Sequence, residues 1–262
     1  MLVIIRGAGD IASGIALRLY NSGIKIIMTE IPLPTSIRRT VCFSEAVYCG
    51  ETKVEGVTAV LCADAFEAVK CTEIGKIAVL ADENGNILKQ LYAECVVDAR
   101  LAKRNIDTSI DDAPIVIGVG PGFTAGKDCH AVIETKRGHY LGRVIYEGSA
   151  QENTGIPGNI SGFTVERLLT APRDGVITRV LPIGTQVKQG DVCGYVEDVP
   201  IKARIDGVLR GMLREGTCVY KGMKSGDIDP RSDVEYCNFV SDKALAVGGG
   251  VLEAIGCFLS KR

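Results

Sequence analysis

The chain has little of what the common catalytic and metal-binding classes require. It carries only two histidines, His130 and His139, so a histidine-rich metal site is excluded. Its ten cysteines are scattered and no two form a Cys-x-x-Cys pair, which favours reduced thiols over a metal or redox centre. No Gly-x-Ser-x-Gly turn is present to supply the serine of a Ser-His-Asp hydrolase.

An excess of charge of one sign is also missing. Lys and Arg number 30 and Asp and Glu 32, without a long block of either, so we expect no nucleic-acid partner and no binding to an anionic membrane. The charge-free stretch over residues 114–126 is shorter than a membrane-spanning helix and contains four glycines. Arg6 and Asp10 interrupt the apolar start of the chain, which is unlike a secretory signal. We therefore expect a cytoplasmic protein.

What the chain does have is glycine, and a regular alternation of apolar segments. With 31 glycines in 262 residues the sequence predicts many tight turns, and its length indicates two domains. Up to about residue 105, short apolar runs alternate with helix-like segments, which is typical of a parallel sheet. We predict strands over residues 2–5, 24–29, 58–62, 76–81 and 94–98 and helices over residues 10–21 and 63–70. The pattern predicts a Rossmann-like α/β domain over residues 1–150.

The later part of the chain changes character. From about residue 114 to 149, β-type alternation predicts antiparallel strands embedded in the first domain. A glycine-rich, polar stretch predicts a linker over residues 151–170. Residues 171–230 contain a duplication at a spacing of 32 residues, in which residues 171–177 repeat at 203–209 and residues 184–191 at 216–223. This zone predicts a small β module made of two similar halves.

A C-terminal helical segment, residues 231–262, closes the chain. It contains a helix that we expect over residues 241–259, with Ser241 and Asp242 as candidates for its N-terminal cap. Gly248, Gly249 and Gly250 lie in its middle, and each costs a helix about 1 kcal/mol relative to alanine. The run predicts either a break in the helix or a very closely packed neighbour.

The first candidate site is the segment that follows the first strand. Gly7 permits a tight turn, Gly9 lets a pyrophosphate approach the backbone, and the small Ala12 permits close packing of helix on sheet. An anion would bind at the helix N-terminus, although Asp10 places a carboxylate there. Glu30, 23 residues after Gly7, is placed to bind ribose hydroxyls and favours NAD over NADP. The same glycines can instead serve strand-to-helix packing alone.

A second glycine-rich loop and two arginines extend this prediction. The loop over residues 118–130 leaves an apolar strand, and its backbone N–H groups could form an anion-binding nest. Its candidate cofactor-binding residues are Gly120, Gly122, Thr124 and Lys127, and its candidate catalytic residues are Asp128, Cys129 and His130, with Cys129 a thiol of lowered pKa. Arg38 and Arg39 could bind a cofactor phosphate, or could be solvated surface residues.

Four blocks of sequence extend beyond these motifs: residues 6–14, residues 37–47, residues 118–130, and residues 241–243 with 248–250. They closely resemble the YqeB family, which is associated with selenium-dependent molybdenum hydroxylases, and the resemblance covers nearly the whole chain. It implies an accessory role in maturing a xanthine-dehydrogenase-like enzyme, with transient handling of its molybdenum cofactor or of a selenium species. The implied partners are the hydroxylase subunit or its maturation proteins, and a homo-oligomer stays open.

The duplicated zone resembles the biotinyl/lipoyl hammerhead, in which Ala-Pro-x-x-Gly and Gly-x-x-Val-x-x-Gly segments pair across a flattened barrel. The resemblance implies a barrel-sandwich β module. Carrier proteins of that kind present a modifiable lysine on the hairpin between the halves, whereas the tip here is Glu197-Asp198-Val199-Pro200, and Lys202 lies beyond it. We therefore expect neither biotin nor lipoate, and a structural or docking role for the module.

These expectations combine into an α/β plus β protein that acts as an accessory or maturation factor. It would bind NAD, another nucleotide or an anionic cofactor at its glycine-rich loops. Two alternatives stay open. One is a stand-alone NAD-dependent oxidoreductase that uses His130 or a cysteine as proton donor, and the other is a non-catalytic docking scaffold whose glycine loops are structural. We assign no metal site.

Overall fold

The computed structural model describes residues 1–261 and divides the chain into two compact units. The first unit comprises residues 1–34, residues 42–154 and the chain from Val240 onward. The second comprises Thr35–Val41 and Gly155–Phe239. The range 231–262 is therefore shared, because its residues up to Phe239 belong to the second unit and the following residues to the first. Each unit is completed by a segment that is distant in sequence.

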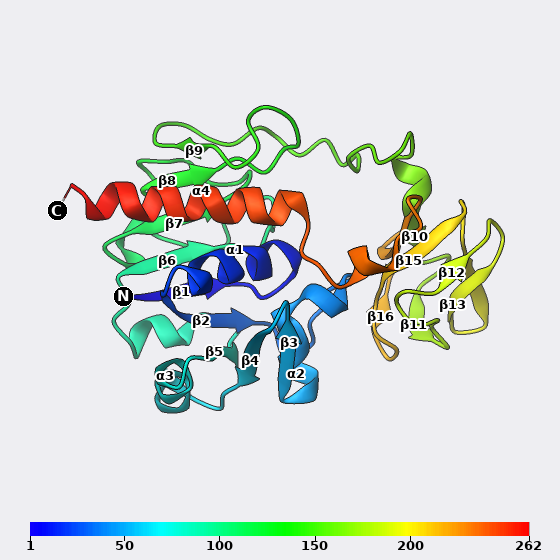
Figure 1. Cartoon of the computed structure of the whole chain (residues 1–262), viewed down its shortest axis with the longest axis horizontal. Helices are drawn as coiled ribbons and strands as arrows, with labels where there is room; N and C mark the ends of the chain where they lie inside the picture. The colour runs from blue at the N-terminus through cyan, green and yellow to red at the C-terminus, as the bar shows by residue number, and fades with distance from the viewer. Residues whose placement is uncertain (262) are drawn as a thin grey trace. The chain divides into compact units, whose positions relative to one another are not determined.

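The core of the first unit is a sheet of nine strands in the order β3-β4-β5-β2-β1-β6-β7-β8-β9 (Figure 1). Its strands are β1 (Leu2–Arg6), β2 (Lys25–Glu30), β3 (Glu51–Val54), β4 (Val57–Leu61), β5 (Ile77–Ala81), β6 (Cys95–Asp98), β7 (Val116–Val119), β8 (Ala131–Ile133) and β9 (Val144–Ile145). The strands predicted up to residue 98 are confirmed to within one or two residues.

Parallel pairing dominates the centre of this sheet. β1 pairs in parallel with β2 on one side and with β6 on the other, and the parallel run extends from β4 to β8. The apolar residues of β1, β6 and β7 are buried except for the half-buried Leu2, as expected for strands covered on both faces. The chain moves outward from β1 to β2 and later returns to the other side of β1 at β6, so the direction of winding reverses at β1.

The expected fold class, a Rossmann-like parallel sheet joined to a biotinyl/lipoyl-like barrel-sandwich module, is wrong. The nine-stranded sheet is mixed, since β3 pairs antiparallel with β4 at one edge and β9 with β8 at the other. The β3–β4 hairpin closes on Glu55 and Gly56, both with positive φ, which suits the twist of a two-residue turn. The segment from residue 114 is no separate insert, because β7 and β8 pair in parallel and continue the same sheet, but the predicted antiparallel pairing is present within it between β8 and β9.

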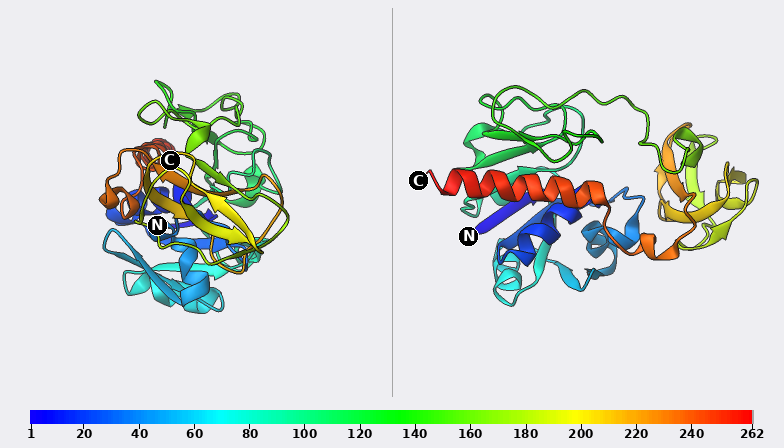
Figure 2. Two further views of the ribbon diagram at one scale, coloured as in Figure 1. Left: turned by 90° about the vertical axis from the view of Figure 1, so that its right-hand side faces the viewer. Right: turned by 45° about the horizontal axis from the view of Figure 1, so that its top comes forward.

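Helices cover both faces of the sheet. They are α1 (Asp10–Asn21), the short α2 (Ala46–Cys49), α3 (Ala65–Glu73) and α4 (Asp242–Leu259). α3 and the 3-10 helix η3 (Asn86–Lys89) cover the face that contains Ile4, Ile27 and Val96. α1 and α4 pack side by side, and the views of Figure 2 show α4 lying along the sheet. Among residues 1–261, no helix is long and apolar enough to cross a membrane.

Helix α4 resolves the question raised by its three glycines. The helix is unbroken over Asp242–Leu259, and the glycines allow close packing instead. A Cβ on Gly248 would lie 2.9 Å from the carbonyl oxygen of Gly14 in α1, and a Cβ on Gly250 would clash with the backbone of Gly142. Gly249 faces open space. The prediction of a close neighbour therefore holds at the first and third positions of the run.

The second unit contains two four-stranded sheets, β10-β17-β15-β12 and β14-β13-β11-β16. Its strands are β10 (Leu168–Thr170), β11 (Gly175–Thr178), β12 (Gln186–Val187), β13 (Val192–Val196), β14 (Val199–Lys202), β15 (Gly207–Met212), β16 (Cys218–Val219) and β17 (Lys224–Asp229). The 32-residue duplication is confirmed, because β15, β16 and β17 each begin 32 residues after β11, β12 and β13. The halves exchange strands: β11 pairs with β16, and β15 with β12.

A segment from outside the duplication completes this unit. Ile37 packs against the apolar core of the unit, and its carbonyl oxygen accepts the N–H of Met212 at 2.9 Å. Gly211 is needed there, since a Cβ would lie 2.7 Å from the Ile37 side chain. The expected module of residues 171–230 is therefore built on β10 and residues 35–41 as well. Sequence adjacency could not predict this addition.

Candidate functional site

The candidate site lies at the carboxyl ends of the parallel strands of the first unit. In open α/β sheets, ligands bind outside this edge, where the direction of winding reverses. Here that point is between β1 and β6, at Gly7 and Ala99. Gly7 has a φ of +102°, and a Cβ on it would lie 3.1 Å from the carbonyl oxygen of Ala99. Gly7 thus fills the role predicted for it, a tight turn with close backbone contact.

The loop from Gly7 to Gly9 leads directly into α1. Gly9 is the N-cap residue of this 12-residue helix and provides no side-chain cap. The side chain of Ser13 in α1 holds the loop in place. Its hydroxyl donates to the Ala8 carbonyl oxygen at 3.1 Å and accepts the N–H of Phe43 at 2.9 Å. Ala12 is buried at the helix–sheet contact, as predicted for a small residue at that position. The loop is rigid and presents the positive end of a helix dipole.

Glu30, at the end of β2, is bound to this loop. Its Oε2 accepts the N–H of Ala8 and its Oε1 accepts the N–H of Ile31, both at 2.9 Å. Burial raises the pKa of the Glu30 carboxyl, while the two backbone hydrogen bonds act in the opposite direction. Each oxygen retains acceptor capacity for a second donor. The sequence predicted the place of Glu30 but not its role in orienting the glycine loop.

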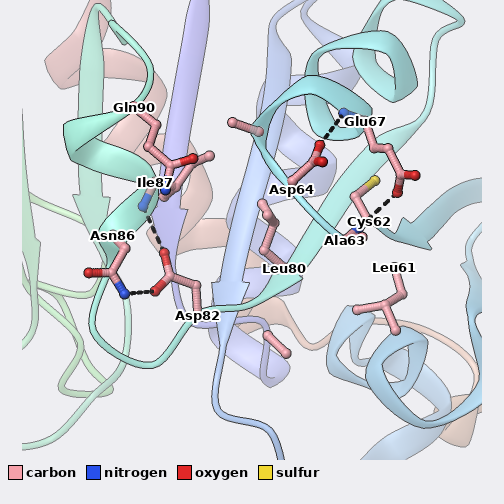
Figure 3. Close-up of a pocket in the computed structure, with 12 residues that line it drawn as sticks. Leu61, Cys62, Ala63, Asp64, Glu67, Leu80, Asp82, Asn86, Ile87 and Gln90 are labelled. Carbon is pink, nitrogen blue, oxygen red and sulfur yellow. Dashed lines mark hydrogen bonds between the residues drawn. The ribbon is translucent and has the colours of Figure 1, made fainter.

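A pocket of about 510 Å³ opens beside Glu30, at the ends of β4 and β5 (Figure 3). The pocket and Glu30 are adjacent in the sheet, because Ala81, which lines the pocket, is the partner of Glu30 in the pairing of β5 with β2. The apolar wall comes from Leu61, Leu80 and Ile87. The pocket was not predicted from the sequence. The sequence did carry a signal for it, because Asp64 follows β4 and precedes α3, and Asp82 follows β5 and precedes η3.

The acidic side chains of the pocket are held by their own loops. Asp64 caps α3 by accepting the N–H of Glu67 at 2.9 Å, and Glu67 accepts the N–H of Ala63 at 2.9 Å. Asp82 accepts the N–H of Ile87 at 2.8 Å and the side-chain amide of Asn86 (Figure 3). These contacts fix both walls. The acidic lining favours a neutral or amine-bearing group in the pocket over an anion.

An ionic network lies beneath the point where the winding reverses. Arg6, at the end of β1, donates to Asp107 at 2.8 Å and to the Thr108 hydroxyl at 3.0 Å. Arg100 donates to Asp98 at 2.6 Å and to the same Asp107 at 2.7 Å. Partial burial acts to raise the pKa of Asp107, but hydrogen bonds from both arginines hold it below its usual range. The network ties the end of β1 to the loop after β6.

Cations gather near the N-terminus of α1. The pKa of Lys243, in the first turn of α4, is lowered by burial and by the charges of Lys103 and Arg137, while Asp10 and Glu134 act to raise it. Arg137 also pairs with Asp242 at 2.7 Å. These residues come from three separate segments, so sequence spacing could not group them. Asp10, which appeared unhelpful to an anion, acts on the pKa of Lys243 and so lies near this one cation.

The second glycine loop is organised differently from the predicted anion nest. The N–H of Gly120 donates to Ile133, that of Ala125 to Gly148 and that of Gly126 to Cys129, each through a backbone carbonyl. The N–H of Thr124 donates to the Asp128 carboxylate at 2.8 Å, and the N–H groups of Lys127 and Asp128 return to the Thr124 carbonyl. These N–H groups are consumed by the fold of the loop. A Cβ on Gly122 would lie 2.6 Å from the backbone of Arg104, so this glycine serves close packing.

The three candidate catalytic residues, Asp128, Cys129 and His130, also serve the packing and hydrogen bonding of their own loop. Burial raises the pKa of the Cys129 thiol to about 11, which is opposite to the lowered pKa that we predicted. The Nδ1 atom of His130 accepts the N–H of Val116 at 3.0 Å, and its ring packs edge-on against Phe258. Asp128 holds the loop through Thr124. Each side chain has a structural task, and none lines the pocket of Figure 3.

The two candidate arginines belong to the second unit. Arg38 is buried and donates to the carbonyl oxygens of Tyr236 at 3.0 Å and Phe239 at 2.7 Å. Arg39 donates through Nε to the carbonyl oxygen of Met212 at 2.8 Å. These contacts hold residues 35–41 in place. Both guanidinium groups are thus used inside the second unit.

The fold and the site define a protein with a mixed α/β unit, a duplicated β unit and a pocket at the carboxyl ends of the parallel strands. No protein-family model matches the chain. The chain is 56% identical over 254 residues to an Escherichia coli (strain K12) protein described as the uncharacterized protein YqeB, and the match covers 97% of the chain and 47% of that relative. This identity supports membership of the YqeB family. The chain spans about half the length of that relative.

Two solved structures are distantly similar to the chain. An aspartoacylase family protein from Mesorhizobium loti matches with 14% identity over 87% of this chain and 84% of that chain, at a TM-score of 0.30. A succinylglutamate desuccinylase/aspartoacylase from Rhodobacter sphaeroides matches with 15% identity over the same shares, at a TM-score of 0.27. Scores of this size do not establish a common fold. Among residues 1–261, no group of three or more His, Cys, Asp or Glu side chains is placed to hold a metal ion.

Proposed function

We propose that this chain binds a nucleotide along the edge formed by the carboxyl ends of β4, β5, β2 and β1. The base would occupy the pocket beside β5 and the ribose would bind Glu30. The phosphates would bind at the N–H groups of the first turn of α1, since the N–H groups of Gly7 and Ala8 already donate to Thr29 and Glu30. The observation that supports this most strongly is the strand register, which pairs Ala81 of the pocket with Glu30, whose carboxylate in turn binds the N–H of Ala8.

The chemistry changes along this edge in the order that a nucleotide requires. The pocket combines an apolar wall with carboxylates and the amides of Asn86 and Gln90, which suits a planar base that bears amino groups. The opposite end combines the dipole of α1 with Lys243 and Lys103, which suits phosphate. Glu30 lies between the two ends.

For the cellular role, we propose an accessory function in maturing a selenium-dependent molybdenum hydroxylase. Support for this comes from the sequence blocks that resemble the YqeB family and from the identity to YqeB. The hydroxylase subunit or its maturation proteins are the proposed partners, and the duplicated β unit is the proposed docking element. A strain that lacks this protein should make a hydroxylase of low activity and low selenium content. A fully active, selenium-loaded hydroxylase from that strain would contradict the role.

Nucleotide binding can be tested by calorimetry with NAD, ADP and AMP on wild-type protein and on Glu30→Gln. The substitution removes a charged acceptor of ribose hydroxyls and weakens the orientation of the loop. A hydrogen bond to a charged group contributes about 1.5–3 kcal/mol, so affinity should fall roughly 10- to 100-fold.

Glu94→Gln is the matched control for this experiment. Glu94 also accepts a backbone N–H, that of Leu2 at 2.7 Å, but at the opposite end of β1. This variant should bind as wild type does. The proposal fails if the wild-type protein binds none of the three nucleotides, or if both glutamate variants lose affinity equally.

A further inference from the structure

Two arginines at the point where the winding reverses hold one carboxylate between them. Arg6 contacts both oxygens of Asp107, since its Nη1 lies 2.8 Å from Oδ1 and its Nη2 donates to Oδ2 at 2.9 Å. Arg100 donates through Nη2 to the same Oδ1 at 2.7 Å. Paired guanidinium contacts of this kind match the plane and the lone pairs of a carboxylate. We call Arg6 and Arg100 the carboxylate clamp.

The clamp is built into the fold, whereas the carboxylate in it faces solvent. The side chains of Arg6 and Arg100 are 3% and 17% exposed, and that of Asp107 is 43% exposed. Arg100 is fixed by the buried Asp98, which accepts from its Nη2 at 2.6 Å and from its Nε at 3.1 Å. The Nε atom of Arg6 is buried without a hydrogen-bond partner among residues 1–261, so Asp107 leaves one donor of the clamp unused. A molecule that approaches from solvent meets the clamp where the Asp107 carboxylate lies.

Contacts that do not involve the Asp107 side chain hold its loop. The side-chain amide of Asn105 donates to the Thr108 carbonyl oxygen at 2.8 Å, and Oδ1 of Asn105 accepts the N–H of Thr108 at 2.9 Å. The Thr108 hydroxyl donates to Asp98 at 2.7 Å. A rotation about the Cα–Cβ bond of Asp107 would therefore move its carboxylate out of the clamp while the loop and both arginines stay in place.

The segment that leads to Asp107 has an unusual backbone. Leu101 and Lys103 have φ values of +55° and +63°, in the left-handed region that side-chain-bearing residues rarely adopt. Backbone strain of this kind is concentrated at ligand clamps and switch segments. The strained residues lie between Arg100 and Asp107, so they connect the clamp to the carboxylate that fills it.

We propose that Arg6 and Arg100 are a binding site for a carboxylate-bearing small molecule, and that Asp107 is a tethered occupant which such a ligand displaces. Without a carboxylate in the clamp, the two arginines keep Asp98 as their one counter-charge in the cluster, and an unpaired buried cation strongly favours an anion. The tether gives Asp107 a high effective concentration, so a free ligand must compete with it.

Formate is the probe, because it is the group that Asp107→Ala removes. Thermal unfolding of the full chain is followed as formate replaces chloride at constant ionic strength. A ligand that binds the folded state raises the unfolding temperature and the effect follows its occupancy, so the midpoint of the rise reports affinity. Asp107→Ala should respond saturably, and wild-type protein should need at least about tenfold more formate for the same rise. Inorganic phosphate, which is tetrahedral, should be less effective on Asp107→Ala than formate is.

Two variants control this experiment. Asp111→Ala removes an exposed carboxylate four residues later and should respond as wild type does. Asp107→Ala/Arg100→Gln breaks the clamp and gives the baseline effect of formate on the fold. If Asp107→Ala is unfolded in chloride, recovery of folded protein in formate is the corresponding result.

Three results would overturn the proposal. The clamp binds no free carboxylate if Asp107→Ala responds to formate no more than the double variant does. Asp107 is a permanent partner rather than a displaceable one if wild-type protein never exceeds that baseline. The site is not selective for carboxylates if phosphate is as effective as formate. No nucleotide is present in any arm, so the outcome is independent of the proposed function.

Discussion

The three consecutive glycines of α4 permit a prediction at neighbouring positions of one helix. Alanine in place of glycine inside a helix stabilises by about 1 kcal/mol. At Gly249 a Cβ meets nothing within 4 Å, so Gly249→Ala should gain that full amount. At Gly250 the added methyl would overlap the Gly142 carbonyl group, whose carbon would lie 3.0 Å away. The obstacle is backbone, which cannot turn aside as a flexible side chain can.

Overpacking of this kind costs about 1–3 kcal/mol. Gly250→Ala should therefore lose between nothing and about 2 kcal/mol after its helix gain is included, and should be about 1–3 kcal/mol less stable than Gly249→Ala. Both variants carry the same chemical change on adjacent residues. The difference between them isolates the packing of α4 against the Gly142 turn.

The assay is urea unfolding followed by helical circular dichroism, with the same transition compared in the two variants and in wild-type protein. Because the chain has two units, tyrosine fluorescence is recorded in parallel to detect separate transitions. The expected order of stability is Gly249→Ala, wild type, Gly250→Ala. Equal stability of the two variants, or a more stable Gly250→Ala, would show that α4 does not pack against Gly142 as described.

Three further predictions concern charge. Burial raises the pKa of the Glu30 carboxyl, so the protonated side chain stabilises the fold below the ordinary carboxyl pKa of about 4.3, and this stabilisation is lost as pH rises through the raised pKa. The free energy of unfolding of Glu30→Gln, measured by urea titration, should therefore depend less on pH between the ordinary and the raised pKa than that of wild type. Burial acts to raise the pKa of Asp229, but hydrogen bonds from Arg231 and the charge of Arg210 outweigh it and lower the pKa. The ionised Asp229 therefore stabilises the fold above the ordinary aspartate pKa, and this stabilisation is lost as pH falls through the lowered pKa. Asp229→Asn removes the carboxylate partner of Arg231 and one of the two carboxylates that bind Arg210, which keeps Asp227, and should cost about 1.5–3 kcal/mol at neutral pH by the same assay. Lys243→Met should weaken nucleotide binding without loss of unfolding free energy, because burial and neighbouring cations already disfavour the charged lysine; a calorimetric affinity equal to that of wild type would remove Lys243 from the proposed site.

Sequence patterns were sufficient to predict those elements that depend on the geometry of neighbouring residues. The turn at Gly7, the helix that begins at Asp10 and the strand that ends at Glu30 follow from residue spacing and the conformational freedom of glycine. The 32-residue duplication was visible for the same reason, since each half repeats its own turns. Neither pattern reveals which strands pair, so the antiparallel β3–β4 edge and the exchange of strands between the halves were missed. The antiparallel β8–β9 pair lies in the segment where antiparallel strands were predicted.

The second glycine loop shows why the rest of the site could not be predicted. Its N–H groups looked available to an anion, but the N–H of Gly120 and the N–H of Ala125 are used by Ile133 and Gly148, residues 13 and 23 positions later. Arg38 looked exposed, but carbonyl groups about 200 residues away enclose it. A motif shows which groups a loop has, whereas long-range contacts decide which of them stay available.

The buried network around Arg6 connects the two ends of the proposed site. Arg6 donates to Asp107 and Thr108 through its terminal nitrogens, while its Nε is buried without a partner, an arrangement that costs stability. Replacing such networks by apolar residues is often neutral or stabilising, so stability alone does not account for this one. Gly85, in the loop that holds Asp82, lies directly over the guanidinium, where a Cβ would come within 3.1 Å of Nη2. The Arg6 guanidinium therefore packs against the loop that holds Asp82 and binds the loop after β6, and it lies at the end of β1, directly before the Gly7–Gly9 loop of the proposed site.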